Sequence, residues 1–232
     1  MSNNSLPFTA CTINIKHCKC FEKLNPAEKE LLEANSVEIK YKKGEIICKQ
    51  GAFAPNIMMM VSGLAKVFME TGTKSLVLKI IPDGNFIGMA SVAESQNTYF
   101  YSAMTYVDSV VRQIDLVTFK QLLSQNSAFA KEVIDILTSN SLQIYGRFFC
   151  ITQKQAFGRL ADIILCLSDR VFKHSEFNLP LSRKDLADLT CMSPETVIRI
   201  LNKFASEGLI KMDGKKFSVV NFEQLRQISE KG

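Results

Sequence analysis

The sequence has 232 residues, of which 47% are hydrophobic and 22% are charged, so it can build a globular core and is not a disordered chain. No apolar run approaches the roughly 18–20 residues of a membrane span, and Met1–Ala10 lacks the features of a secretory signal. We therefore expect a cytoplasmic protein without a membrane partner. The 28 Lys and Arg against 23 Asp and Glu leave a net charge of +5, which is too small to indicate a nucleic-acid partner by itself.

From about Val37 to Asp115, the chain consists of short apolar or alternating runs that are separated by turn residues. The runs expected to form strands are Val37–Tyr41, Ile46–Cys48, Ile57–Val61, Leu64–Glu70 and Ser75–Ile81. Many short strands at this spacing predict a β-roll or jelly-roll barrel.

Helical periodicity follows the strands. A short helix is expected from Val117 to Leu123, and a much longer one from Ser127 to about Gln153. Apolar residues recur along the long helix at intervals of three and four, with Asn140 in the same stripe: Phe129, Val133, Leu137, Ile144, Phe148 and Ile151. A narrow stripe of this kind is typical of a two-stranded seam, in which one Asn can fix the register. We favour a homodimer; the alternative is that the stripe packs on its own β-domain.

The segment from Ser182 to Ser206 predicts a helix-turn-helix. Ser182 and Asp185 have the spacing of a capping box, and the tight connection Thr190–Met192 ends the first short helix. Ser193 and Pro194 then predict the cap and first turn of a second helix, which runs to about Ser206. Two short helices joined by such a turn are typical of a DNA-binding unit.

A hairpin is expected directly after the second helix. Leu209–Met212 and Lys216–Val220 are apolar or alternating, and Asp213-Gly214 between them is a favoured hairpin turn. This hairpin would be the wing of a winged helix.

The second helix of such a unit presents its N-terminal residues to base edges in the major groove. Glu195 and Arg199 are four residues apart and share one face, so Arg199 can bind guanine while Glu195 accepts from cytosine or orients Arg199. Arg183, Ser193 and Thr196 are candidates for phosphate contacts, and Lys203, Lys215 and Lys216 for weaker attraction to the backbone.

The whole chain beyond its first twenty residues resembles the Crp/Fnr family of transcription regulators. The matching residues are Lys43–Glu45, Gly51, Ser62-Gly63, Gly84–Gly88, Leu181–Arg183 and Glu195–Leu201. The resemblance implies a cyclic-nucleotide-binding-type β-roll, a dimerisation helix, and a winged helix that binds a two-fold operator. By resemblance, Glu195 and Arg199 match the base-reading positions, whereas Pro194 and Ile198 replace polar readers.

The effector site departs from the family pattern. Members that bind cyclic AMP place a glutamate after the Gly88 equivalent and an arginine before a Ser-Ala pair; this sequence has Met89 and Tyr101 there. A cyclic phosphate would lose its charge-assisted partner, so the sequence disfavours cyclic AMP. Lys79 or Arg112 could supply a cation, but the sequence places neither at the site. The candidate effector pocket consists of Phe86, Met89, Tyr101 and Ser102.

Cysteine and methionine offer two other kinds of sensor. Cys11, Cys18 and Cys20 precede the β-roll, where oxygen-sensing members hold iron–sulfur ligands, although Arg112 best matches the position of the fourth ligand. A cluster would then need Cys48 or His17; free thiols are the simpler interpretation. A haem is a further alternative, and its candidate axial ligands are His17, Met58, Met59, Met60, Met69 and Met89. Methionines at strand spacing are usually core residues, which is the simpler interpretation of these. Cys150, Cys166 and Cys191 are expected to be small core residues.

The sequence thus predicts an α+β protein in three parts: a sensing β-roll domain at 1–126, a dimerisation helix at 127–153 and a winged helix-turn-helix at 154–232. Its predicted function is sequence-specific DNA binding in transcription regulation, controlled by a redox, nitrosative or small-molecule signal, with RNA polymerase as a further partner. The alternatives are a DNA-binding protein without an effector, or a cysteine-based redox or metal protein. No catalytic arrangement is present in the sequence, so we do not expect an enzyme.

Overall fold

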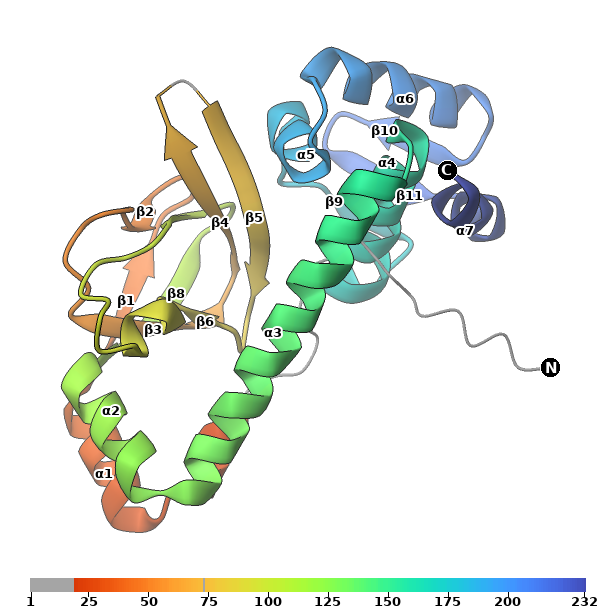
Figure 1. Cartoon of the computed structure of the whole chain (residues 1–232). Helices are drawn as coiled ribbons and strands as arrows, with labels where there is room; N and C mark the ends of the chain where they lie inside the picture. The colour runs from red at the N-terminus through yellow and green to blue at the C-terminus, as the bar shows by residue number, and fades with distance from the viewer. Residues whose placement is uncertain (1–18, 73) are drawn as a thin grey trace. The chain divides into compact units, whose positions relative to one another are not determined.

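A computed structural model describes residues 19–72 and 74–232. The chain divides into two compact units, one whose described part ends at Asn140 and one whose described part is Ser141–Gly232. The long helix α3 (Ser127–Gln153) contributes its first half to the first unit and its second half to the other (Figure 1). Each unit is described separately below.

The first unit contains two four-stranded antiparallel sheets, with strand orders β1-β8-β3-β6 and β2-β7-β4-β5. The strands are β1 (Ser36–Tyr41), β2 (Ile46–Cys48), β3 (Asn56–Ser62), β4 (Leu64–Thr71), β5 (Lys74–Pro82), β6 (Phe86–Ile87), β7 (Ser102–Thr105) and β8 (Ser109–Asp115). All the strands that the sequence predicts are present, and the β-roll is confirmed. Strand β6 has only two residues, which is too short to be detected from hydrophobic periodicity.

Two hydrophobic clusters hold this unit together. One is enclosed by the two sheets and includes Cys48, Val67, Ala103 and Val111. The other joins the β1-β8-β3-β6 sheet to helices and includes Phe86, Phe119 and Phe129. These helices are η1 (Cys20–Lys23), α1 (Pro26–Ala34), η2 (Met89–Val92), α2 (Leu116–Gln125) and the first half of α3.

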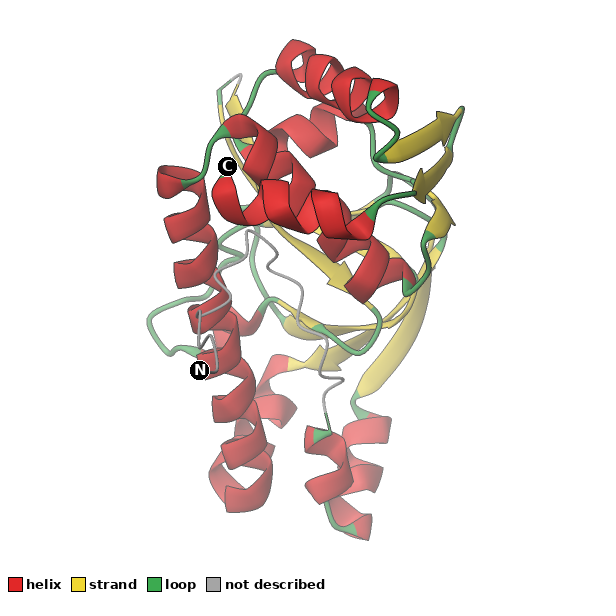
Figure 2. Ribbon diagram, turned by 90° about the vertical axis from the view of Figure 1, so that its right-hand side faces the viewer, coloured by secondary structure: helices red, strands yellow, loops and turns green. Residues whose placement is uncertain are grey.

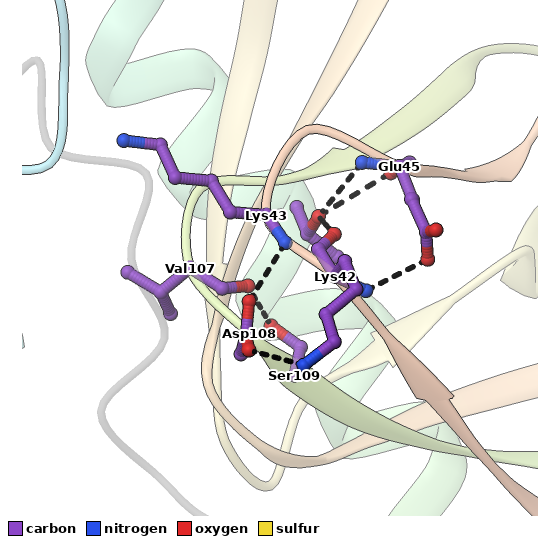
Figure 3. Close-up of polar contacts among 7 residues, drawn as sticks. Lys42, Lys43, Glu45, Val107, Asp108 and Ser109 are labelled. Atoms are coloured by element: carbon purple, nitrogen blue, oxygen red, sulfur yellow. Dashed lines mark hydrogen bonds and ion pairs between the residues drawn. The ribbon is translucent and has the colours of Figure 1, made fainter.

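The turn between β1 and β2 and the turn between β7 and β8, which each connect the two sheets, are tied together by polar contacts (Figure 3). The carboxylate of Asp108 accepts from the backbone N–H of Lys43 at 2.9 Å and from the ammonium of Lys42 at 3.0 Å. The hydroxyl of Thr105 donates to the carbonyl of Lys42 at 2.6 Å. Gly63 packs so closely against Ser109 that a Cβ would overlap it, and its φ of 110° lies in the left-handed region that favours glycine.

The stripe that the sequence indicates along α3 lies on one face of the helix, but its burial changes along the length. At its start, Phe129 and Val133 are buried against the roll of their own chain. Exposed apolar side chains follow at spacings of three, seven and four, namely Ile134, Leu137, Ile144 and Phe148, which we call the exposed stripe. Asn140, between Leu137 and Ile144, accepts a hydrogen bond from β5 of its own chain, and its role in the register of a seam stays a prediction.

The second unit is a winged helix-turn-helix with one more strand than expected (Figure 2). Its elements are α4 (Ala156–Cys166), the π-helical η3 (Leu167–Phe172), β9 (Glu176–Asn178), α5 (Arg183–Thr190), α6 (Pro194–Ser206), β10 (Ile210–Asp213), β11 (Lys216–Val219) and α7 (Phe222–Lys231). The sheet has the order β10-β11-β9, so β9 extends the predicted wing hairpin. The rings of Phe172, Phe177 and Phe217 stack behind it and fix this third strand.

Across the described ranges, every helix is too short or too polar to cross a membrane.

Candidate nucleic-acid interface

Local caps determine where α5 and α6 begin. The hydroxyl of Ser182 accepts from the backbone N–H of Asp185 at 3.1 Å, while the Asp185 carboxylate accepts from the N–H of Ser182 at 2.9 Å. Ser193 caps α6 in the same way by accepting from the N–H of Thr196 at 3.2 Å. Both helices start at the residues that the sequence predicts, because Ser at the cap satisfies N–H groups that have no partner inside the helix.

The turn between the two helices has a left-handed residue at its centre. Cys191 has a φ of 53°, and the N–H of Met192 bonds to the carbonyl of Ala187 at 3.0 Å, which closes α5. Cys191 is exposed here. The expectation that it is a core residue was wrong, since the turn points its side chain away from the apolar face.

Helix α6 buries one face and leaves the other exposed. Val197, Ile200, Leu201 and Phe204 are buried against the rest of the unit. Glu195, Arg199 and Lys203 share the opposite, exposed face, and Ile198 is 44% exposed beside them. The face that the sequence assigns to base contacts is thus available on the surface of this unit.

Glu195 and Arg199 do not pair with each other. The carboxylate of Glu195 is hydrogen bonded by its own backbone N–H and by the hydroxyl of Ser193, which lowers its pKa. The guanidinium of Arg199 lies over the ring of Phe157 on α4, 5.6 Å from its centroid. Each side chain is therefore held by a separate contact, and both keep polar edges that face outward.

The other residues predicted to contact DNA differ in how strongly their side chains are held by the rest of the protein. Arg183 is partly buried, and its Nη2 lies 3.5 Å from the sulfur of Met212 on β10; this burial lowers its pKa. Lys203 forms an ion pair of 2.9 Å with Glu207, one turn further along α6. Lys215 and Lys216 are exposed at the tip of the wing.

A buried arginine that the sequence did not single out lies behind the helix-turn-helix. Arg147, on the second half of α3, is 6% exposed. Its Nη2 donates to the carbonyl of Leu189 at 3.0 Å, and its guanidinium also bonds to the thiol of Cys191. A cation at the carboxyl end of α5 is favourable because the last carbonyls of a helix carry partial negative charge. The sequence signal that could have identified Arg147 is that it is a single charged residue within an apolar stretch of the long helix.

The residues of the candidate effector pocket are divided between two packing clusters, although Tyr101 reaches the backbone next to Met89. Phe86 and Met89 belong to the cluster that packs against helices, outside the space between the sheets. Tyr101 packs on the enclosed cluster, and its hydroxyl accepts from the N–H of Gly88 at 3.0 Å. Ser102 is buried and accepts from the N–H of Gln50 at 3.0 Å.

Both halves of the chain match described protein families. Residues 38–126 match the cyclic nucleotide-binding domain, and residues 158–228 match the Crp-like helix-turn-helix domain. The chain belongs to the Crp/Fnr family of transcription regulators. Its relatives include the anaerobic regulatory protein of Aggregatibacter actinomycetemcomitans, with 23% identity over 94% of this chain and 89% of the relative. The fumarate and nitrate reduction regulatory protein of Escherichia coli K12 is also 23% identical, over 94% of this chain and 91% of the relative.

Solved structures agree with this Crp/Fnr assignment at the level of the fold. A putative regulator of the same family from Eubacterium rectale has a TM-score of 0.76 at 18% identity, covering 91% of this chain and 98% of that one. FixK2 from Bradyrhizobium japonicum has a TM-score of 0.75 at 19% identity, covering 83% of this chain and 96% of that one.

The described residues of this Crp/Fnr chain do not fit an iron–sulfur cluster. Within 19–72 and 74–232, no group of three or more His, Cys, Asp or Glu side chains could hold a metal ion. Cys20 is buried and disulfide-bonded, and burial raises the pKa of Cys48 to about 12, so its thiol is protonated. Cys11, Cys18 and His17 lie outside the described residues, so their role stays a prediction.

The structure also places three other groups that the sequence singled out: Arg112, two of the methionines and Cys166. Arg112, at the position of the fourth ligand, donates to Glu33 and Glu38 at 2.9 Å each, so it is already paired. Met58 and Met60 are buried in the enclosed cluster, as expected for core filler. Cys166 is also buried, but it is disulfide-bonded, which the sequence did not indicate.

Proposed function

We propose that this chain acts in the cytoplasm as a homodimeric transcription regulator that binds a two-fold operator through α6 and responds to an effector other than cyclic AMP. The family consists of transcription regulators, and the proposed function needs no catalytic step.

Base recognition is assigned to Glu195 and Arg199. The observation that carries the proposal is their shared exposed face near the start of α6, with no ion pair between them in the described structure. Such an arginine can bind guanine O6 and N7 in a bidentate manner, and the carboxylate can accept from cytosine N4. The ring of Phe157 supports the guanidinium from behind and reduces the freedom lost on binding.

Backbone contacts are assigned to residues around the helix-turn-helix. Ser193 and Thr196 lie at the N-terminal end of α6, where N–H groups and the helix dipole favour a phosphate. Arg183 and Lys203 add positive charge on either side, and Lys203 would exchange Glu207 for a phosphate. These contacts orient the protein but do not select a sequence.

Dimer formation is assigned to the exposed stripe of α3. Ile144 and Phe148 are 60% and 70% exposed in the single chain. Apolar side chains at this spacing pair in coiled coils, and two copies would place their α6 helices about 34 Å apart, one turn of B-DNA. In this proposal, RNA polymerase is the further partner that the bound dimer recruits or excludes.

The first test measures operator binding with an arginine variant and a matched control. Operators are selected by the full-length protein from a library of random palindromes, and affinities are then measured by fluorescence anisotropy. Arg199→Ala should weaken operator binding by roughly 5- to 150-fold and relax one base position in each half-site. The control is Arg226→Ala on α7, because Arg226 also lies over a phenylalanine ring, at 5.9 Å, but outside the helix-turn-helix. If Arg199→Ala binds the selected operator as tightly and as selectively as Arg226→Ala, the assignment of base recognition fails.

A further inference from the structure

Helix α6 carries one large apolar side chain on the face that is assigned to base contacts. Ile198 lies three residues after Glu195 and directly before Arg199, and it is 44% exposed. The apolar residues that α6 uses for packing lie on the opposite face, where Val197 and Phe204 are fully buried. Ile198 therefore lies outside the core of the unit and presents a branched hydrocarbon surface to solvent.

The two charged neighbours of Ile198 are each held by another group. The carboxylate of Glu195 is hydrogen bonded by its own backbone N–H and by the hydroxyl of Ser193. The guanidinium of Arg199 lies over the ring of Phe157, 5.6 Å from its centroid. Ile198 thus lies between two oriented polar side chains. Its own χ1 is restricted because it is β-branched, so it has little side-chain freedom to lose on binding.

The apolar character of Ile198 determines what it can recognise in a major groove. An isoleucine side chain has no hydrogen-bond donor or acceptor, so it cannot pair with the polar edges of guanine, adenine or cytosine. Covering such an edge would leave its polar groups without partners, which is unfavourable. Thymine differs because it also presents a C5 methyl group, with which an apolar side chain makes a favourable contact. Of the four bases, thymine is therefore the one that this side chain favours.

We propose that Ile198 selects one thymine in each operator half-site by packing against its C5 methyl group. Because Ile198 is next to Arg199 in α6, this thymine should lie within about two base pairs of the guanine assigned to Arg199. The proposal rests on operator binding through α6, and it names a base that the contacts of Glu195 and Arg199 leave unspecified.

The contact would depend on the methyl group and not on the base that carries it. The ring of 5-methylcytosine bears a methyl group at the same position as thymine, so Ile198 should favour it over unmodified cytosine. A polar side chain would instead distinguish the O4 acceptor of thymine from the N4 donor of cytosine. Dependence on the methyl group therefore separates an apolar contact by Ile198 from recognition through hydrogen bonds.

The test replaces the thymines of the selected operator by deoxyuridine, which lacks only the methyl group. One symmetric pair of positions is changed at a time, and affinities of the full-length protein are measured by fluorescence anisotropy at a fixed salt concentration. At one thymine in each half-site, the wild type should bind roughly 15-fold more weakly, about fourfold for each methyl group that is no longer buried. Ile198→Ala should bind the unmodified and the deoxyuridine operators about equally.

Val220→Ala is the control for Ile198→Ala. Val220 is also a branched apolar residue of the second unit and is 50% exposed, but it follows β11 at the end away from the tip of the wing. The control should keep the full loss of affinity with deoxyuridine. Since Ile198 is exposed and alanine is a good helix former, Ile198→Ala should fold with an unchanged thermal midpoint, Tm.

A second pair of operators carries cytosine or 5-methylcytosine at the sensitive position. Methylation should strengthen binding of the wild type by roughly 15-fold and leave binding of Ile198→Ala unchanged. The proposal is overturned if the selected half-site has no thymine near the guanine, if loss of the methyl group does not weaken binding of the wild type, or if Ile198→Ala keeps the sensitivity of the wild type. All three results need a protein that selects an operator, so they differ from failure of the proposed function, in which no operator is selected and both proposals fall.

Discussion

Each unit of the molecule holds a cation against a neutral hydrogen-bond acceptor, and the two cations have different surroundings: Arg147 is buried and Lys79 is partly buried. In the second unit, Arg147 lies at the carboxyl end of α5 and bonds to the carbonyl of Leu189. In the first unit, Lys79 ends a row of apolar side chains and bonds to one side-chain amide. The first arrangement completes a helix terminus, whereas the second gives the ammonium a single side-chain amide as its acceptor.

The two units also differ in where their polar groups point: those of the helix-turn-helix face solvent, and those of the roll face its interior. The helix-turn-helix holds its predicted contacts on the outside with short local caps, so it is preorganised for a partner that approaches from solvent. The roll instead turns its unusual groups inward, and these include the buried hydroxyl of Tyr101 and the ammonium of Lys79. We conclude that the unit assigned to DNA binding is built for recognition and that the roll is built for control.

The largest expected effect comes from the helix that both units share. Phe148→Asp places a charge in the exposed stripe, where the proposed dimer would bury it, so the protein should become monomeric. Operator affinity should then fall by roughly 100-fold or more, because the two half-sites would be bound independently. Sedimentation velocity and fluorescence anisotropy measure both quantities.

Lys131→Asp is the control for Phe148→Asp. Lys131 is exposed on the same helix but lies outside the exposed stripe. A dimeric Phe148→Asp protein with normal operator affinity would show that the exposed stripe does not form the interface.

Arg147→Leu tests the cation that satisfies the carboxyl end of α5, and it sharpens the contrast with Lys79. The substitution leaves the carbonyl of Leu189 buried without its donor, so the free energy of unfolding should fall by about 2 kcal/mol. The opposite sign is expected for Lys79→Met, because methionine occupies similar space and removes a partly desolvated charge whose acceptor is a neutral amide. Urea denaturation of both variants, with the surface variant Arg226→Leu as control, gives the comparison directly. If Arg147→Leu and Lys79→Met change stability in the same direction, the distinction between the two cations is lost.

The helix-turn-helix could be predicted in detail because its determinants are local. Ser182, Asp185, Ser193 and Pro194 specify both helix starts within a few residues of sequence. The separation of Glu195 from Arg199 could not be predicted, since it depends on Phe157, which is distant in the sequence. Local rules place a side chain on a helix face, but they do not reveal which ring lies beneath it.

The sequence predicts that this unit is a β-roll, but it does not predict which side chains meet inside the roll. Its strands follow from alternation and turn residues, but the row from Cys48 to Lys79 depends on the register of four strands. For the same reason, Phe86 and Met89 were grouped with Tyr101 although they pack in another cluster. On α3, spacings of three and four predict the stripe, but they do not show that Phe129 and Val133 are covered by the roll of their own chain while Ile144 and Phe148 are exposed.

The smallest expected effect tests whether nonlocal contacts also stabilise the surface of the roll. Asp108 joins the turn between β7 and β8 to the turn between β1 and β2, and its pKa is lowered by the backbone N–H of Lys43 and by the ammonium of Lys42. Because the pKa is lower in the folded protein, this charge stabilises the fold above the unfolded pKa of about 3.9, and the contribution is lost as the pH falls through the folded value. Asp108→Asn should therefore slightly lower the urea midpoint at pH 6 and have no effect near pH 2.

The asparagine oxygen can still accept from Lys43, so this variant removes the charge while it keeps an acceptor. Added salt should reduce the difference at pH 6, since the ion pair with Lys42 is exposed. An unchanged midpoint at both pH values would mean that the charge of Asp108 adds nothing to the uncharged bonds that join the two turns, which include the bond from Thr105 to Lys42. The charge would then matter only in the interior of the roll, and the contrast between an outward-facing recognition unit and an inward-facing control unit would become sharper.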